Sequence, residues 1–416
     1  MSKRAIFNAC LVAVALLASL SAALLAYGTD PDWGRYRHGL NLILLTARLS
    51  GLLATVSLLC CLAVVAMIVA GRRRIFWLII LGPVLALFAH RIFSNPMRIY
   101  GILDNPTCVK ADAATFLADS DYVVGVTLKD TPYAYPYSAL FRSPVVLQAN
   151  HDEQYLLIWS MFANRVIVQQ VDRTVRCGEL QIVSMPANAL LLYNGRGGQF
   201  INGVTGLTTR GEKPAGFHTP LQTYKLTWAQ WKSLHPDTWV LSAATNDRQV
   251  TQPVLPRYPI SAAPAHDQRP QMIAFLPTTR PIALPMDAVG TGPTNIGIGE
   301  IQLLLVRDSK SGLLKAFNRQ LDEDLAPLFH TKSDAKRPSV AWEDNDSGTE
   351  WSADGRGIEG QFKGKQLQSV PVDDADYLEV MQHWFPDLQQ LTPLQPTGRA
   401  SKFDNPSDSK TRRRRR

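Results

Sequence analysis

Long apolar runs without charge occupy the first hundred residues of the chain. Residues 5–27 and 49–70 contain no Asp, Glu, Lys or Arg, and each is long enough to supply the roughly 20 helical residues that a bilayer core requires. A third run, residues 75–89, is shorter and contains Pro83, so a re-entrant or tilted segment is the alternative there. We therefore predict a membrane region over residues 1–96, with two spans as the alternative to three. The three expected spans are at about 5–27, 49–70 and 75–93.

The first apolar run also has the basic start of a cleaved signal peptide, in Lys3 and Arg4. It is long for a signal peptide, however, and further apolar runs follow at once, so we expect an uncleaved helix. Basic residues in short loops mark the cytoplasmic side, and Lys3, Arg4 and Arg72–Arg74 do so here, although three arginines in the first loop weaken the asymmetry. We therefore expect the amino terminus in the cytoplasm and everything after about residue 97 outside it.

From about residue 105 to 392 the pattern changes to short apolar runs separated by Gly, Pro, Asn and Asp. This punctuation is typical of a β-rich fold. The polar stretch 308–312 predicts a hairpin loop. Strands are expected at residues 123–128, 155–159, 165–169, 181–184, 189–193, 272–276, 301–306 and 313–317.

The same landmarks recur at an offset of 149 to 150 residues. Pro132–Pro136 aligns with Pro281–Pro285, and Pro236 with Pro386. A short amphipathic helix is expected before Pro236 and another before Pro386, the first with Thr227 as its expected N-cap. We therefore predict an N-terminal α-helical membrane region followed by a β-rich α+β soluble domain made of two pseudo-symmetric repeats. The expected boundaries are 97–250 for the first repeat, 251–395 for the second and 396–416 for a disordered basic tail.

Composition narrows the class of protein. With 46% hydrophobic and 19% charged residues the chain is neither disordered nor fibrous. The net charge of +8 is matched by the eight arginines of Arg72–Arg74 and the final five residues, so the remainder is close to neutral and no nucleic-acid partner is expected. Five cysteines are too few for a disulfide scaffold. Cys108 and Cys177, in the soluble part, are expected to form one disulfide, with two unrelated buried thiols as the alternative.

Several of these segments resemble the domain of unknown function 3179 family. They include Asp121–Val126, Ala134–Pro136, Leu192–Asn194 and, most specifically, Thr227–Thr238, whose sequence is Thr-Trp-Ala-Gln-Trp-Lys-Ser-Leu-His-Pro-Asp-Thr. The resemblance covers about residues 105–392. It implies a prokaryotic protein but names no activity. Together with the spans, it implies a multi-pass protein of the bacterial cytoplasmic membrane with an extracytoplasmic soluble domain.

The chain departs from the family at one turn. Typical members of the family that it resembles carry Cys-Pro-Leu-Cys-Gly at that turn, with Trp-His-Glu upstream. This chain has Trp159–Asn164 at the turn and Arg142–Val145 upstream, without those Cys, His and Glu residues. A Cys-x-x-Cys pair with a His is the kind of set that binds metal or performs thiol redox chemistry. We expect that chemistry to be lost here, and the turn to be a plain strand end.

No other part of the sequence supplies a recognisable catalytic set. The eight His residues form no H-x-x-x-H or H-E-x-x-H pair, so no catalytic residue, metal or cofactor is predicted. His235 is interpreted as a helix cap, and Asp373, Asp374 and Asp376 as capping residues of the second helix. The segments that carry the family resemblance offer four candidate ligand-contacting residues, Tyr135, Tyr193, Asn194 and His235.

Three functions remain open. The favoured one is a membrane-anchored extracytoplasmic binding or scaffold domain without catalysis, so whether the chain is an enzyme stays uncertain. The alternatives are a metal, redox or hydrolytic enzyme with an unplaced site, and a glycan- or small-molecule-binding module in a cleft between the repeats. The lipid bilayer is one expected partner, and the basic tail offers a contact for anionic lipid or cell-surface polymer, unless it is merely solvated. The tail arginines are Arg412, Arg413, Arg414, Arg415 and Arg416.

Overall fold

The computed structural model describes most of the chain outside two long stretches and a few short ones. The described residues are 3–70, 74–93, 95–242, 271–278, 280–290, 292–308, 311–322, 325–332 and 340–394. The expected boundary at 250/251 and the tail at 396–416 lie outside them. The described residues fall into two compact units: a first unit within Met1–Val109, Tyr135–Leu221 and Leu241–Gln268, and a second within Lys110–Ala134, Gln222–Val240 and Arg269–Arg416.

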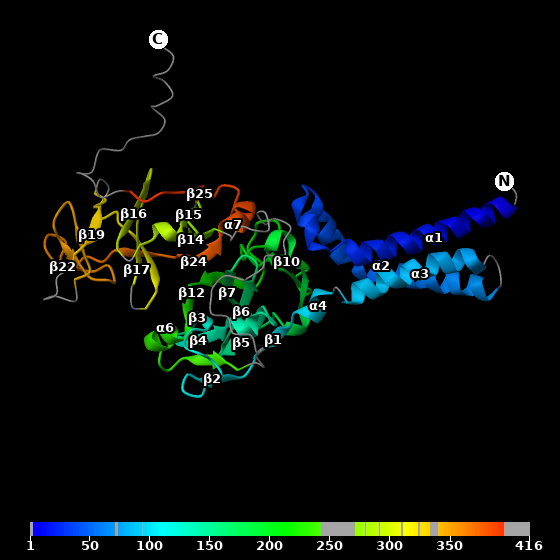
Figure 1. Cartoon of the computed structure of the whole chain (residues 1–416), viewed down its shortest axis with the longest axis horizontal. Helices are drawn as coiled ribbons and strands as arrows, with labels where there is room; N and C mark the ends of the chain where they lie inside the picture. The colour runs from blue at the N-terminus through cyan, green and yellow to red at the C-terminus, as the bar shows by residue number, and fades with distance from the viewer. Residues whose placement is uncertain are drawn as a thin grey trace, which may run out of the picture. The chain divides into compact units, whose positions relative to one another are not determined.

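Three long apolar helices open the first unit, as predicted, and lie side by side in Figure 1. They are α1 (Lys3–Tyr27), α2 (Gly39–Val69) and α3 (Arg74–Phe93), and η1 (Pro31–Arg35) joins the first two. All three are long and apolar enough to cross a membrane. Small side chains line their contacts: Ala18 and Ala22 are buried beside Val84, as expected where membrane helices approach closely.

The second helix begins at Gly39, ten residues before the start of the predicted span at 49. The absence of charge identifies the part of a helix that tolerates lipid, but not where the helix starts. Here the extra turns are stabilised by packing, because Ile43 is fully buried against Leu191 and Phe200 of the first unit. Arg48 therefore lies inside the helix, with its guanidinium 5.4 Å from the Phe200 ring.

Two sheets form the β part of the first unit. One has the order β1-β5-β6-β7-β11 and the other β10-β9-β8. The unit also contains the short helices α4 (Pro96–Ile99) and α5 (Tyr137–Leu140) and the 3₁₀ turns η2 (Cys177–Glu179) and η3 (Pro186–Asn188). The strands are β1 (Ile102–Asp104), β5 (Val145–Asn150), β6 (Glu153–Ser160), β7 (Arg165–Val171), β8 (Leu180–Ser184), β9 (Leu191–Asn194), β10 (Gln199–Asn202) and β11 (Phe217–Leu221).

A further five-stranded sheet has the order β12-β3-β4-β13-β2, and its strands β3 and β12 lie in the second unit with α6 (Trp228–Leu234). Strand β12 is antiparallel to β3, whereas β13 is parallel to β4. The strands are β2 (Cys108–Lys110), β3 (Tyr122–Leu128), β4 (Thr131–Pro136), β12 (Thr223–Thr227) and β13 (Trp239–Leu241).

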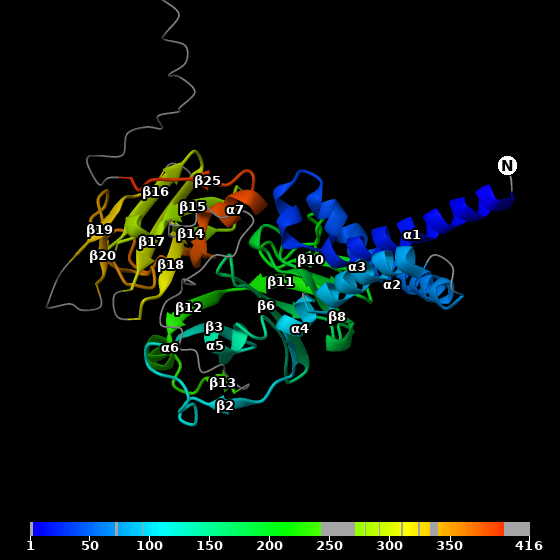
Figure 2. The ribbon, with the colours of Figure 1, turned by 45° about the vertical axis from the view of Figure 1, so that its right-hand side comes forward.

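The rest of the second unit contains three four-stranded sheets, with orders β24-β14-β15-β25, β16-β17-β18-β23 and β19-β20-β21-β22. Most of their strands are labelled in Figures 1 and 2. The sheets carry η4 (Met286–Ala288) and α7 (Leu378–Trp384). The first two sheets contain β14 (Met272–Leu276), β15 (Ile282–Pro285), β24 (Asp373–Tyr377), β25 (Gln389–Gln390), β16 (Thr294–Ile298), β17 (Ile301–Arg307), β18 (Leu314–Asn318) and β23 (Gln368–Val370). The third contains β19 (Phe329–Thr331), β20 (Trp342–Asp344), β21 (Glu350–Trp351) and β22 (Gly357–Glu359).

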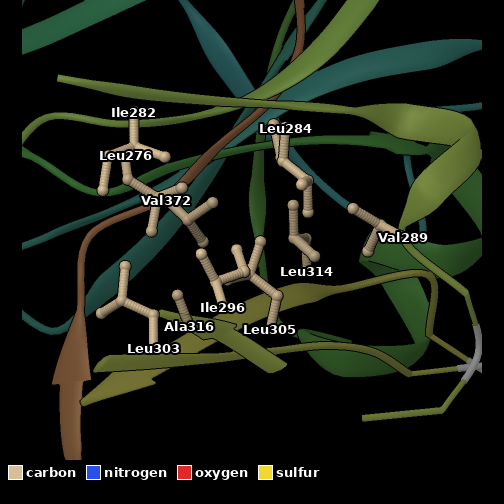
Figure 3. Close-up of a cluster of buried hydrophobic side chains, with 11 residues drawn as sticks. Leu276, Ile282, Leu284, Val289, Ile296, Leu303, Leu305, Leu314, Ala316 and Val372 are labelled. Carbon is tan, nitrogen blue, oxygen red and sulfur yellow. The ribbon is translucent and has the colours of Figure 1, made fainter. Parts of the chain in front are cut away.

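Strand β17 is buried on both faces, which explains its continuous apolar run. Leu303 and Leu305 point into a core shared with Leu284 of β15, whose side chains converge in Figure 3. Leu304 and Val306 point the other way, into a second core that contains five buried Trp and Phe rings of the third sheet and its neighbours. The alternation of side chains along a strand therefore makes β17 the shared layer between two cores.

Candidate functional site

The most specific family motif builds the N-terminal cap of helix α6. The Thr227 hydroxyl accepts a hydrogen bond from the Gln230 backbone N–H at 3.3 Å, and the Gln230 side chain accepts one from the Thr227 N–H at 3.0 Å. This reciprocal capping box confirms Thr227 as the N-cap. The backbone N–H groups of Trp228 and Ala229 donate to the carbonyls of Asp121 and Asp119, which fixes the helix start against β3.

The second Trp of the motif locks the helix onto the sheet. Trp231 is fully buried, its indole N–H donates to the Thr238 hydroxyl at 3.0 Å, and its ring lies 4.2 Å from that of His235. A β-carbon added to Gly125 would come within 2.3 Å of the Trp231 ring, so only glycine permits this approach. Burial lowers the pKa of His235, which favours the neutral ring stacked on the indole. The Trp, His and Thr of the motif therefore hold the fold together.

The densest set of charged side chains lies where β12 meets β24, and we call Lys225, Arg307, Asp374 and Asp376 the charged cluster. The Lys225 ammonium donates to the Asp376 carboxylate and to the Asp374 carbonyl, each at 2.5 Å. The Lys225 and Asp376 side chains are only 2% and 0% exposed. Arg307 donates two hydrogen bonds, both of 3.1 Å, to the Asp374 carboxylate. Two cations thus face two anions, and the set is neutral as a whole.

The charged cluster also influences the residues around it. Burial, and next the charge of Asp374, raise the pKa of the Tyr122 phenol, while Arg307 opposes that effect. A small depression beside the cluster is lined by side chains that include Thr223, Lys225 and Asp374. The Thr223 hydroxyl is buried there without a hydrogen-bond partner. Both carboxylates are engaged by cations, so the geometry is that of a structural network.

The turn where the chain departs from the family is a tight hairpin buried in the first unit. Strand β6 ends at Ser160, and residues 161–164 turn into β7, with Asn164 in the left-handed region at φ 49°. The Ser160 hydroxyl accepts from the Leu190 N–H at 3.0 Å, and the Tyr137 hydroxyl donates to the Asn164 side-chain oxygen at 2.9 Å. These hydroxyl and amide groups are used by the fold. Within the described residues, no three His, Cys, Asp or Glu side chains are grouped in a way that could hold a metal ion.

The four candidate ligand-contacting residues lie on β4, on β9 and at the end of α6. Tyr135 is buried on β4, and His235 caps α6 in the second unit. Tyr193 and Asn194 are consecutive on β9, so their side chains point to opposite faces of the sheet. The Tyr193 ring lies 4.8 Å from Phe200, in the cluster that packs on α2, whereas the buried Asn194 side-chain oxygen has no hydrogen-bond partner. A ligand-contacting role for these residues stays a prediction.

Both soluble cysteines carry free thiols in the structure, so their pairing also stays a prediction. They lie in the same part of the first unit. Burial, and next the charge of Asp104 at the end of β1, raise the pKa of Cys177. The Cys108 thiol lies 3.7 Å from the side-chain oxygen of Gln148, which is on β5, the strand that pairs with β1. Burial raises the pKa of Cys108 to about 11.

The capping role assigned to the acidic residues before the second helix is wrong. Asp373, Asp374 and Asp376 lie in strand β24, and α7 follows Tyr377 without a side-chain cap. Asp376 and Asp374 instead neutralise Lys225 and Arg307, two residues that the sequence analysis missed. The local pattern gave no signal for this pair, because alternation places Lys225 on the face of β12 opposite the apolar Tyr224 and Leu226.

Comparison with known proteins agrees with the motif. A family model described as a protein of unknown function (DUF3179) matches residues 101–388. No curated protein and no solved structure matches the chain significantly. The match confirms the resemblance seen in the sequence and covers the β-rich region with α6 and α7. The chain therefore belongs to the DUF3179 family, whose members share this domain but have no described activity.

Proposed function

We propose that the protein is a membrane-anchored, extracytoplasmic binding or scaffold protein without catalytic activity. The observation that carries the proposal is the direct junction between the apolar helices and the first β sheets. The Ser184 hydroxyl on β8 donates to the Thr29 carbonyl at the end of α1, at 2.7 Å, and both groups are buried. Ile43 of α2 shares a core with Leu191 and Phe200. Such a junction holds a β-rich surface at a fixed height above a membrane.

The basic loops support the extracytoplasmic side. Lys3 and Arg4 are the first residues of α1, and Arg72–Arg74 follow α2 in the sequence, with Arg74 as the first residue of α3. Both groups therefore fall at the same end of a three-helix bundle. Short loops rich in Lys and Arg stay in the cytoplasm. The chain leaves α3 at Phe93, at the opposite end, and the β-rich region follows from there.

The buried ionisable groups support binding in preference to catalysis. Catalytic sites commonly place groups with shifted pKa values in a cleft. Here burial lowers the pKa of Arg319 to about 10, yet its guanidinium bonds the Pro327 carbonyl at 3.2 Å and the Gln302 side chain. The charged cluster is likewise internally paired. These groups stabilise backbone turns and strand contacts.

The soluble region is also proposed to be a tandem duplication. The sheet orders β12-β3-β4-β13 and β24-β14-β15-β25 support it. In each sheet the last strand along the chain pairs in parallel at one edge, and a short helix connects it to the strand before it in the chain. Contacts between positions 150 residues apart add support. The Gln222 amide donates to the Val372 carbonyl at 2.6 Å and accepts from the Val372 N–H at 3.3 Å. Contacts between equivalent positions are expected near a twofold axis.

A reporter that is active only in the cytoplasm tests the side of the membrane. Fused after Thr392, it should be silent, and fused after Gly71, in the basic loop, it should be active. Activity at Thr392 would overturn the extracytoplasmic assignment while leaving the helix–sheet junction intact. A charge-neutral loop, with Arg72 to Arg74 changed to Gln, provides a control, because it should weaken the bias between the two positions.

The absence of catalysis is tested by comparing variants at the turn where the chain departs from the family with variants at the junction between the helices and the sheets. In a strain whose phenotype depends on this gene, Asn164→Asp and Ser160→Thr should restore growth, because no reaction passes through that turn. Ser184→Ala combined with Ile43→Asn should fail although the protein still enters the membrane. Loss of function with the turn variants at normal protein abundance would indicate chemistry there and would contradict the proposal.

A further inference from the structure

Beyond the three spans, the segment that leaves α3 carries an unusual set of exposed apolar side chains. Phe93 is 76% exposed, Ile99 53% and Met97 39%, and Ile92 precedes them at 46%. Large apolar groups gathered within eight residues on a surface indicate a partner. Ile92 and Phe93 end the candidate span, whereas Met97 and Ile99 lie past it on α4, which follows α3 directly in Figure 1.

The β fold holds this segment in place. Asn95 caps α4 by accepting from the Met97 N–H at 3.1 Å, and the Ile182 N–H of β8 lies 3.1 Å from the Met97 sulfur. The Gly101 N–H donates to the Arg142 carbonyl at 2.7 Å, which fixes the exit of the chain. The Met97 side of α4 therefore faces β8, which leaves Arg98 and Ile99 exposed beside it.

The depth of α4 follows from the length of α3. The candidate span Ile75–Phe93 has 19 residues, and a rise of about 1.5 Å per residue gives roughly 28 Å, close to the roughly 30 Å of a bilayer core. The outer ends of α1 and α3 are level, because the Tyr27 and His90 rings stack at 4.9 Å and Arg91 bonds Thr29 at 3.3 Å. The residues just after Phe93 consequently fall within the headgroup layer, about 5–8 Å thick.

The chemistry of the segment fits that layer. Arg98 is exposed between Met97 and Ile99, and among the described residues no ion pair engages it. An arginine flanked by exposed apolar side chains is suited to the boundary between acyl chains and lipid phosphates, where its guanidinium binds phosphate with two N–H groups. Tyr36, 63% exposed in the loop after α1, adds an aromatic side chain typical of the same boundary.

We propose that Phe93 and residues 95–99 form an interfacial anchor, with Phe93 and Ile99 inserted at the acyl boundary and Arg98 bound to the phosphate of an anionic phospholipid. The anchor rests on the proposed membrane insertion of α3 and adds the partner that its outer end binds. Because α4 is fastened to β8, the anchor fixes the first unit against the membrane surface. The occupant is the lipid headgroup layer, which is continuous with the lipid around α3.

Photocrosslinking in the full chain tests the location. The purified protein is reconstituted in phosphatidylglycerol–phosphatidylcholine liposomes with p-benzoyl-phenylalanine replacing Ile99, Leu85 or Phe116. Leu85 is 53% exposed in the middle of α3, and Phe116 is 41% exposed in the second unit. We expect lipid adducts at 99 and 85, and none at 116. An adduct at 85 without one at 99 overturns the anchor alone, and adducts at neither overturn the membrane insertion of α3 as well. A protein adduct at 99 overturns the anchor in favour of a polypeptide partner.

Native mass spectrometry of the full chain in detergent tests the phosphate contact. Arg98→Gln should lower the affinity for added phosphatidylglycerol about fivefold, the change expected for about 1 kcal/mol per arginine near an anionic surface. Arg356→Gln, an exposed arginine of the second unit, is the charge-matched control and should leave that affinity unchanged. Equal loss with both variants, or no loss with Arg98→Gln, overturns the role of Arg98.

Discussion

Lys225 and Asp376 form a buried ion pair although 151 residues separate them in the chain, with Nζ 2.5 Å from Oδ1. Lys225 lies on β12 and Asp376 on β24, so the pair joins the edge strands of two different sheets. Neither side chain touches solvent appreciably. A buried ion pair contributes little net stability by itself but makes each partner dependent on the other. Its value here is to fix how β12 and β24 meet.

The first prediction follows from that dependence. Lys225→Met should destabilise the protein by about 3–5 kcal/mol, because it removes the cation that neutralises the buried Asp376 carboxylate. The double variant Lys225→Met, Asp376→Leu should recover most of this loss, since both charges are then removed. Thermal unfolding of the full chain in detergent measures both changes. A double variant no more stable than the single one would show that other groups, not Asp376, carry the dependence on Lys225.

The second prediction concerns the close approach of Gly125 to Trp231. Gly125→Ala should cost about 1–3 kcal/mol, because the new methyl group collides with the indole ring. At the positions 149 and 150 residues later the chain carries Ala274 and Met381, both fully buried. Under the proposed duplication, this pair is the equivalent of Gly125 and Trp231, with a methyl group opposite a thinner side chain. Adding Trp231→Met to Gly125→Ala should therefore restore part of the lost stability.

Thermal unfolding compares the two variants with Trp231→Met alone, which loses the hydrogen bond to Thr238. The double variant should lose no more stability than the two single variants lose together. A larger loss would show that the Gly–Trp pair of the first half cannot be replaced by the Ala–Met pair of the second. That outcome would weaken the proposed duplication at its most specific position.

The strands could be predicted closely from the sequence, because their signals are local. The expectation of 272–276 coincides with β14, and 301–306 differs from β17 only at Arg307. The capping box of α6 was also visible, since Thr227 and Gln230 are three residues apart. The start of α2 and the partners of Asp374 and Asp376 depend on residues far away in the chain. Those features could not be read from local pattern, and the burial of the 161–164 turn could not either.

The third prediction uses that burial. Sequence alone suggests that a change at this turn costs about 1 kcal/mol, as for an ordinary turn. Because Met161 is 2% exposed, we expect Met161→Ala to cost about 2–5 kcal/mol instead. Ser160→Ala should cost about 1–3 kcal/mol by leaving the Leu190 N–H without its acceptor. Metal analysis of the same purified proteins should find zinc, copper and iron far below one equivalent. A stoichiometric metal lost in either variant would show that the turn holds a rebuilt site.

The fourth prediction is a pH dependence at His235. Burial lowers its pKa in the folded protein, so the unfolded chain takes up the proton more readily. Its contribution to stability is therefore complete above the ordinary histidine pKa of about 6.5 and is lost as the pH falls through the lower folded value. His235→Phe, which keeps a ring against Trp231, should flatten the decline of the unfolding temperature between about pH 7 and 5. His383, whose pKa is also lowered by burial, should account for part of the remaining slope. An unchanged slope in His235→Phe would contradict this assignment.

The last prediction concerns when the Cys108–Cys177 disulfide forms. A disulfide closing a loop of about 70 residues contributes about 4 kcal/mol in the chain-entropy model, provided that the two Cα atoms come within roughly 7 Å. The attacking species is the thiolate, and burial raises the pKa of Cys108 to about 11, so only about one molecule in ten thousand carries it at neutral pH. Burial also raises the pKa of Cys177.

We therefore expect the bond in protein isolated from an oxidising compartment, where it forms before Cys108 is buried. Folded protein prepared reduced should resist oxidation for hours and should oxidise rapidly only after unfolding. Peptide mapping under non-reducing conditions measures both, with Cys108→Ser as the control. Alkylation of both thiols in protein taken directly from the membrane would end the disulfide hypothesis, and fast oxidation of the folded protein would show that Cys108 is more accessible than its burial indicates.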